Sequence, residues 1–62
     1  MHEESYRGSV IRVSQIGPRR RVVVFAGGLI MDDECVWIDG GADEAVAVAE
    51  SKRRIDRRLN SN

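Results

Sequence analysis

The sequence predicts an α+β fold in which a three-stranded antiparallel sheet is followed by one C-terminal helix, in the order β-β-β-α. Three observations lead to this prediction. Residues 9–16 and 20–25 are rich in β-branched side chains, residues 35–39 form another short apolar run, and residues 42–59 are mostly strong helix formers. One helix laid across one face of a small sheet is the simplest arrangement that buries the apolar side of both.

The first two strands are predicted to form a hairpin. Residues 9–16, "SVIRVSQI", alternate loosely between apolar and polar side chains, as a strand does. Gly17 and Pro18 then signal a turn, and the second strand covers residues 20–25. Residues 1–7 are expected to be a flexible tail in front of the sheet.

The third strand is predicted to be short and to follow a long loop. Residues 26–34, "AGGLIMDDE", contain two glycines near the start and three acids at the end, which favours a loop. Residues 35–39, "CVWID", then form the third strand, and the glycines at 40 and 41 end it. The sheet is therefore expected within residues 9–39.

A single helix is predicted over residues 42–59. Asp43 and Glu44 lie at its start and arginines lie at its end, which complements the helix macrodipole. Five apolar side chains share one helical face: Ala45, Val48, Ala49, Ile55 and Leu59. Four arginines fall on the opposite side: Arg53, Arg54, Arg57 and Arg58.

The chain is expected to need a partner. Its 62 residues make a single small domain, and domains of this size lie near the limit of stability. The only cysteine, Cys35, cannot form an internal disulfide, and the only histidine, His2, is too distant in sequence for ordinary zinc-ligand spacing. We therefore expect no metal and no cofactor, and we expect a homodimer to supply the missing burial.

Strand alternation sorts the side chains of the sheet into two faces, and both are largely apolar. One helix covers only one face, so the other is expected to pair with a second subunit or to bind another molecule. Which face the helix covers stays open at this point. The candidate dimer-interface residues are Val22, Val24, Val36 and Ile38.

Charge is arranged in blocks although the net charge is zero. Residues 7–21 contain five arginines and no acid, and residues 32–50 contain seven acids and no base. This asymmetry permits a local basic surface on a neutral protein. A GC-rich genome is an alternative reason for the excess of arginine over lysine.

One sheet face combines arginines with aromatic side chains, which is typical of nucleic-acid binding. Its candidate binding residues are Arg12, Arg19, Arg21, Phe25 and Trp37. The arginines would contact phosphates while the aromatic rings stack on bases. The alternative is that Phe25 and Trp37 belong to the core and that the arginines stay in solvent beside the hairpin turn. The basic stretch 52–58, "KRRIDRR", allows the same two interpretations.

The chain also resembles a known type of DNA-binding domain. "YRG" at 6–8, the strands after it, "VWI" at 36–38 and the helix opening "DEAVAVA" resemble the plan of AP2-type and phage-integrase arm-type domains. The resemblance implies a three-stranded sheet that enters the major groove and is braced by the helix. It also implies DNA contacts from Arg7, Arg12, Arg19 and Arg21. The loop at 26–34 is longer than the family pattern.

Enzymatic function is not expected. "AGG" at 26–28 lacks the spacing of a dinucleotide-binding loop, and the adjacent acids at 32–34 do not converge on a metal without a shaped loop. The start of the chain does not resemble a signal peptide, and no apolar run is long enough for a membrane span, so we expect a cytoplasmic protein. Two functions remain open: a nucleic-acid-binding module and a homodimeric protein-interaction module.

Overall fold

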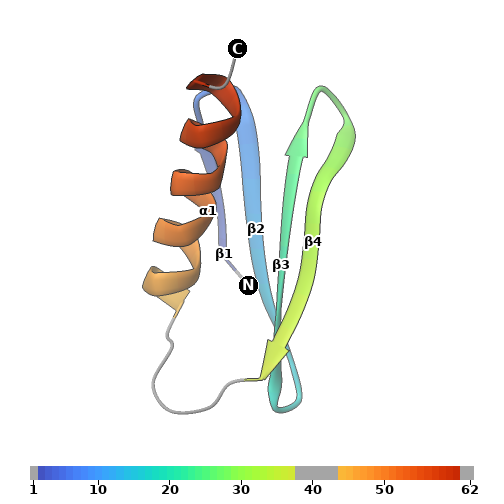
Figure 1. Ribbon diagram of the computed structural model, residues 1–62. Helices are drawn as coiled ribbons and strands as arrows, with labels where there is room; N and C mark the ends of the chain where they lie inside the picture. Colours follow the sequence, from blue (N-terminus) through green and yellow to red (C-terminus); the bar gives the residue numbers. More distant parts are fainter. Residues whose placement is uncertain (1, 38–43, 61–62) are drawn as a thin grey trace.

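The computed structural model describes residues 2–37 and 44–60, and it contains four strands and one helix (Figure 1). The strands are β1 (His2–Tyr6), β2 (Ser9–Ile16), β3 (Arg19–Ala26) and β4 (Leu29–Trp37). They form an antiparallel meander in the order β1-β2-β3-β4, followed by α1 (Glu44–Asn60). The α+β class, the first predicted hairpin and the C-terminal helix are confirmed, whereas the prediction of three strands is wrong.

Residues 26–34 are not a loop but contain the end of β3, a two-residue turn and the first part of β4. Ala26 pairs with Leu29, so Gly27 and Gly28 alone make the turn between β3 and β4. Their φ angles are 60° and 80°, and two successive positive φ angles are what a tight type I′ hairpin turn requires. The last predicted strand therefore starts at Leu29 and not at residue 35. Residues 38 and 39 lie outside the described residues.

The expected N-terminal tail also forms a strand. His2–Tyr6 pairs with β2 in one regular register, from His2 opposite Val13 to Tyr6 opposite Ser9. Its polar sequence, "HEESY", gives little indication of a strand because β1 is stabilised mainly by pairing with β2 and by polar contacts with α1.

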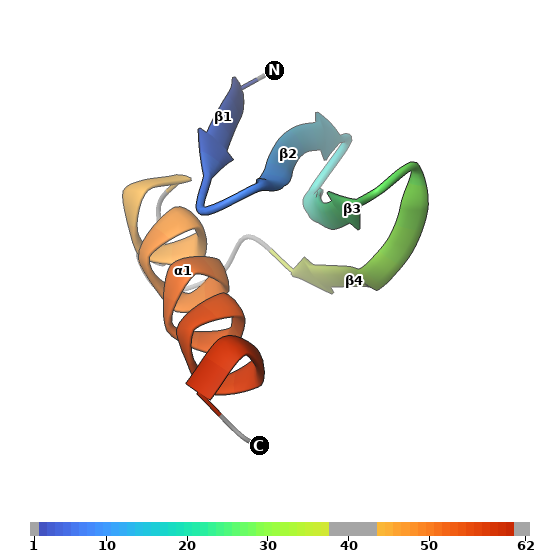
Figure 2. The same cartoon turned by 90° about the horizontal axis from the view of Figure 1, so that it is seen from above.

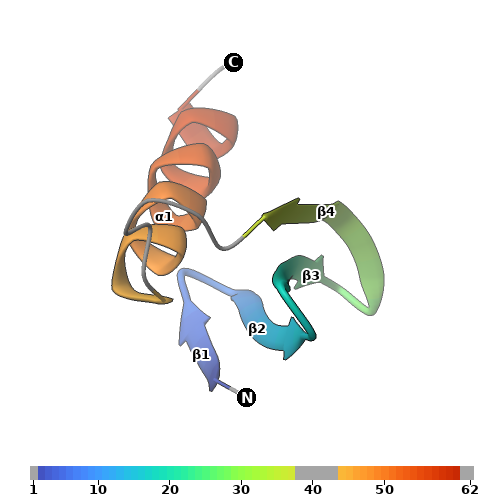
Figure 3. The ribbon, with the colours of Figure 1, turned by 90° about the horizontal axis from the view of Figure 1, so that it is seen from below.

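The sheet is curved, and α1 lies on its concave side (Figures 2 and 3). The core lies between them. It contains Ile11, Val13, Val22, Val24, Val48 and Ile55. The helix therefore covers the aliphatic face of the sheet, which the sequence had left open.

The helix is rotated relative to the predicted apolar face. Val48 and Ile55 are buried as predicted, but Ala49 and Leu59 are exposed and Ser51 is buried in their place. Among the described residues, no helix is both long and apolar enough to cross a membrane.

Candidate functional site

The convex face of the sheet carries two ion pairs that use predicted nucleic-acid-binding residues. Nε of Arg12 donates to Oε2 of Glu3 at 2.8 Å, and the Arg12 guanidinium lies 5.1 Å from the centre of the Phe25 ring. Arg21 binds Asp33 through two parallel hydrogen bonds of 3.0 and 2.8 Å. The Arg21 guanidinium holds the pKa of the Asp33 carboxyl below its usual value.

These pairs cover an apolar residue that no helix covers. Val23 is opposite Arg12 on β2 and Asp33 on β4, and it is only 6% exposed. The aliphatic stems of arginine side chains pack on apolar surface while their charged ends stay in water. Val23 on the second face of the sheet is thus covered by neighbouring side chains, whereas Ile16 and Ile30 on the same face are each 58% exposed.

The other predicted nucleic-acid-binding residues are less closely grouped. Arg19 is exposed at the start of β3, and Phe25 is half-buried. Arg7 lies in the turn after β1, where Nη1 donates to Oδ1 of Asp56 on α1 at 2.8 Å. The structure therefore brings Arg12 and Phe25 together and engages Arg7, Arg12 and Arg21 with carboxylates. The Trp37 side chain lies outside the described part of the structure.

The predicted dimer-interface residues fall in different environments. Val22 and Val24 are buried beneath α1, because the helix covers the aliphatic face on which they lie. A second chain could reach them only if the helix moved away. Val36 is exposed at the β4 edge, and Ile38 lies outside the described residues.

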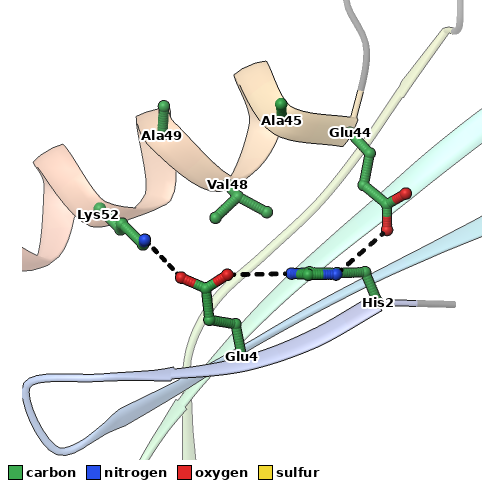
Figure 4. Close-up of a pocket in the computed structure, with 7 residues that line it drawn as sticks. All are labelled: His2, Glu4, Glu44, Ala45, Val48, Ala49 and Lys52. Atoms are coloured by element: carbon green, nitrogen blue, oxygen red, sulfur yellow. Dashed lines mark hydrogen bonds and ion pairs between the residues drawn. The ribbon is translucent and has the colours of Figure 1, made fainter.

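A groove runs between β1 and the first half of α1 (Figure 4). Its volume is about 600 Å³, within the range typical of ligand-binding sites. Val48 points from α1 toward the charged side chains of β1, and Ala45 and Ala49 lie on the side of the helix away from that strand (Figure 4). The lining residues are His2, Glu4, Glu44, Ala45, Val48, Ala49 and Lys52.

The charged side chains of this groove form a continuous row (Figure 4). Lys52 pairs with Oε2 of Glu4, and Oε1 of Glu4 lies 3.1 Å from Nε2 of His2. Nδ1 of His2 lies 3.8 Å from Oε1 of Glu44. Lys52, and after it His2, hold the pKa of the Glu4 carboxyl below its usual value. The sequence did not indicate this groove, because β1 was not predicted to be a strand.

Three large apolar side chains are exposed in succession at the start of β4. Leu29, Ile30 and Met31 are 69%, 58% and 45% exposed. The turn that precedes them lies on the side of the sheet away from α1 (Figures 1 and 2). We call these three residues the hairpin patch. The sequence did not indicate the hairpin patch, because residues 26–34 were predicted to form a loop.

No protein-family model, curated protein or solved structure matches this chain. Within residues 2–37 and 44–60, no cluster of histidine, cysteine or acidic side chains could hold a metal ion, and Cys35 is exposed on β4.

Proposed function

We propose that the chain is a non-enzymatic binding module that forms a homodimer through the hairpin patch. The observation that carries this proposal is the exposure of Leu29, Ile30 and Met31 in succession. Leu29 pairs with Ala26 and Ile30 pairs with Phe25, so their side chains lie on opposite faces and this end of the hairpin exposes apolar surface on both. Isolated exposed apolar residues are common, but three at one end of a hairpin in a small protein favour an interaction surface.

A second copy of the chain is the partner that this patch fits best. A two-fold interface places the same patch of both subunits in contact. When two apolar patches meet in this way, no like charges are brought together. The interface would also bury apolar surface in a protein whose core cluster contains only six buried side chains among the described residues.

Sedimentation velocity over a range of protein concentrations tests this proposal. Leu29→Thr and Ile30→Thr keep side chains that suit a strand but remove apolar surface, so each is expected to weaken the dimer. Val46→Thr, which changes an exposed apolar residue on α1, is the matched control and should leave the dimer unchanged. A chain that stays monomeric, or a dimer insensitive to both strand variants, would contradict the proposal.

Nucleic-acid binding is the second candidate function, and one observation favours it on the helix. Arg53 and Arg57 are exposed and border a shallow groove, and neither has an ion pair within the described residues. By contrast, Arg12 and Arg21 on the sheet are paired with acids. We therefore propose that any phosphate contacts come mainly from α1.

Fluorescence anisotropy with a labelled mixed-sequence DNA duplex, at low and moderate salt, tests this second function. Salt-sensitive binding that is weakened by Arg53→Gln and Arg57→Gln would support the helix as the site. The matched variants Arg12→Gln and Arg21→Gln should have smaller effects. Absence of binding at low salt would contradict nucleic-acid binding and leave protein interaction as the remaining function.

A further inference from the structure

The two edge strands of the sheet differ in how well they could accept another strand. The pairing of β4 with β3 shifts register between Val24 and Phe25 of β3, so that Met31 of β4 has no residue opposite it. A bulge is a common device that protects an edge strand from pairing. Both edge strands carry acids that are paired with other elements, so the bulge in β4 is what distinguishes the two edges.

β1 is the more regular edge. All five of its residues pair with β2 without a register shift, so its other edge presents a regular row of backbone groups. The groove along α1 lies directly beside this strand (Figure 4). An extended segment added to β1 would direct every second side chain toward that groove. Strand addition beside a side-chain pocket is a general mode of peptide recognition, in which backbone hydrogen bonds give affinity and the pocket gives specificity.

The groove indicates what kind of side chains it would accept. Ala45 and Ala49 are small and exposed, and Val48 points toward β1, so there is room for aliphatic side chains of the partner. At one end, the Glu44 side chain is 49% exposed and contacts His2 at 3.8 Å. This contact is longer than a hydrogen bond, so Glu44 retains the capacity to bind a cationic group.

Charge also distinguishes a foreign partner from a second copy. Glu4 on β1 is already paired with Lys52 and His2, and Glu3 is paired with Arg12 on the other face of the sheet, whereas within the described residues Glu44 has only its 3.8 Å contact with His2. β1 carries no lysine or arginine, so a second copy of this strand would bring neither of these cations to Glu44. A segment with lysine or arginine would instead complement the Glu44 carboxylate.

We propose that the groove between β1 and α1 binds an extended, basic and aliphatic segment of another protein, which adds to the sheet as a strand beside β1. The aliphatic side chains of that segment contact the apolar residues of α1 that line the groove, and a cationic side chain pairs with Glu44. This site is separate from the hairpin patch, so it does not depend on the proposed homodimer.

The test uses a capped seven-residue peptide with lysine at each end and alternating threonine and valine between them. A matched peptide carries glutamate in place of lysine. Each is titrated into the isotopically labelled full chain, and amide chemical shifts and hydrogen exchange are followed by NMR. The lysine peptide is expected to shift amides of residues 2–6 and 44–52 and to slow exchange at the outer edge of β1. The glutamate peptide is expected to bind more weakly.

Two pairs of variants make the test specific. Glu44→Gln should weaken binding of the lysine peptide by about two- to fivefold, because it removes one exposed ion pair. Glu50→Gln, which lies outside the groove, should leave the affinity unchanged. Ala49→Gln lengthens a side chain that lines the groove and should weaken binding further, whereas Val46→Gln, which does not line it, should not.

Several results would overturn the proposal: no shifts with the lysine peptide, equal binding of both peptides, or shifts centred on β4. Concentration-dependent changes at β1 without peptide would assign this edge to a second copy instead. Repeating the titration with Leu29→Thr separates the two sites, because loss of the dimer should leave peptide binding intact.

Discussion

The hydroxyl of Tyr6 donates hydrogen bonds to both carboxylate oxygens of Asp56, at 2.8 Å to Oδ1 and 3.0 Å to Oδ2. Arg7 donates to the same carboxylate at 2.8 Å. One acid near the end of α1 therefore anchors both the last residue of β1 and the turn that follows it. These contacts help explain why a polar N-terminal segment is part of the sheet.

Removing the Tyr6 hydroxyl should destabilise the fold through Asp56. Tyr6→Phe is expected to lower the Tm by a few degrees, and Asp56→Ala by more, because it also removes the partner of Arg7. Thermal unfolding followed by circular dichroism measures both. In the Asp56→Ala background, Tyr6→Phe should have almost no further effect, since residues in one network are coupled. Equal effects in both backgrounds would show that the hydroxyl acts elsewhere.

Stability should decrease in acid. Arg7 first, and then Tyr6, hold the pKa of Asp56 below its ordinary value of 3.8, and Arg21 does the same for Asp33. A depressed folded-state pKa means that the unfolded chain binds more protons, so the stabilisation is complete above the ordinary value. It is lost as the pH falls through the lower folded-state pKa. Urea midpoints from neutral pH down to about pH 2 measure this loss.

The Asp56→Ala variant is the control for this pH dependence. Its stability should fall less steeply over the same acid range, because one of the perturbed carboxyls is gone. A variant with the slope of the original chain would assign the acid sensitivity to other groups.

Truncation of Ile55 should be far more costly than truncation of Leu59. Ile55 is 1% exposed in the core, whereas Leu59 is 46% exposed although both lie on the predicted apolar face. Ile55→Ala is expected to cost about 2 to 5 kcal/mol of unfolding free energy, and Leu59→Ala less than about 1 kcal/mol. Urea denaturation measures both. Ile55→Val, with an expected cost of about 1 kcal/mol, remains measurable if the alanine variant does not fold. Similar costs for the two alanine variants would contradict the observed helix rotation.

The turn between β3 and β4 should be sensitive to backbone conformation rather than to space. Gly28 has a φ of 80°, and a Cβ there would meet no atom within 4 Å. Gly28→Val is expected to cost about 1 to 2 kcal/mol, because L-residues other than glycine disfavour this conformation. Gly28→Asn should cost less, since asparagine tolerates it. Equal costs by urea denaturation would argue against a positive φ at this position.

Local patterns in the sequence were sufficient for part of the fold. The β-branched residues at 9–16 and 20–25 and the turn between them predicted the hairpin of β2 and β3. The adjacent glycines at 27 and 28 are also a local hairpin signal, but together with the acids at 32–34 they were interpreted as a loop. Those acids are accommodated in β4 because Arg21 and Arg54 pair with them from neighbouring elements.

The candidate sites depended more strongly on tertiary structure. The sequence placed arginines and Phe25 on one face of the sheet, but it did not show that Glu3 and Asp33 would neutralise Arg12 and Arg21. That outcome depends on the β1–β2 and β3–β4 registers, and both strands at the edges were absent or too short in the prediction. The groove along β1 was missed for the same reason.

The sequence by itself determined the α+β class, the central hairpin and the C-terminal helix, because propensity and periodicity act between residues close in the chain. Tertiary structure decided the two edge strands, the rotation that buries Ser51 rather than Leu59, and the partners of the arginines. These features depend on contacts between distant residues, such as Tyr6 with Asp56, whose free energy becomes available only when the helix and sheet pack together.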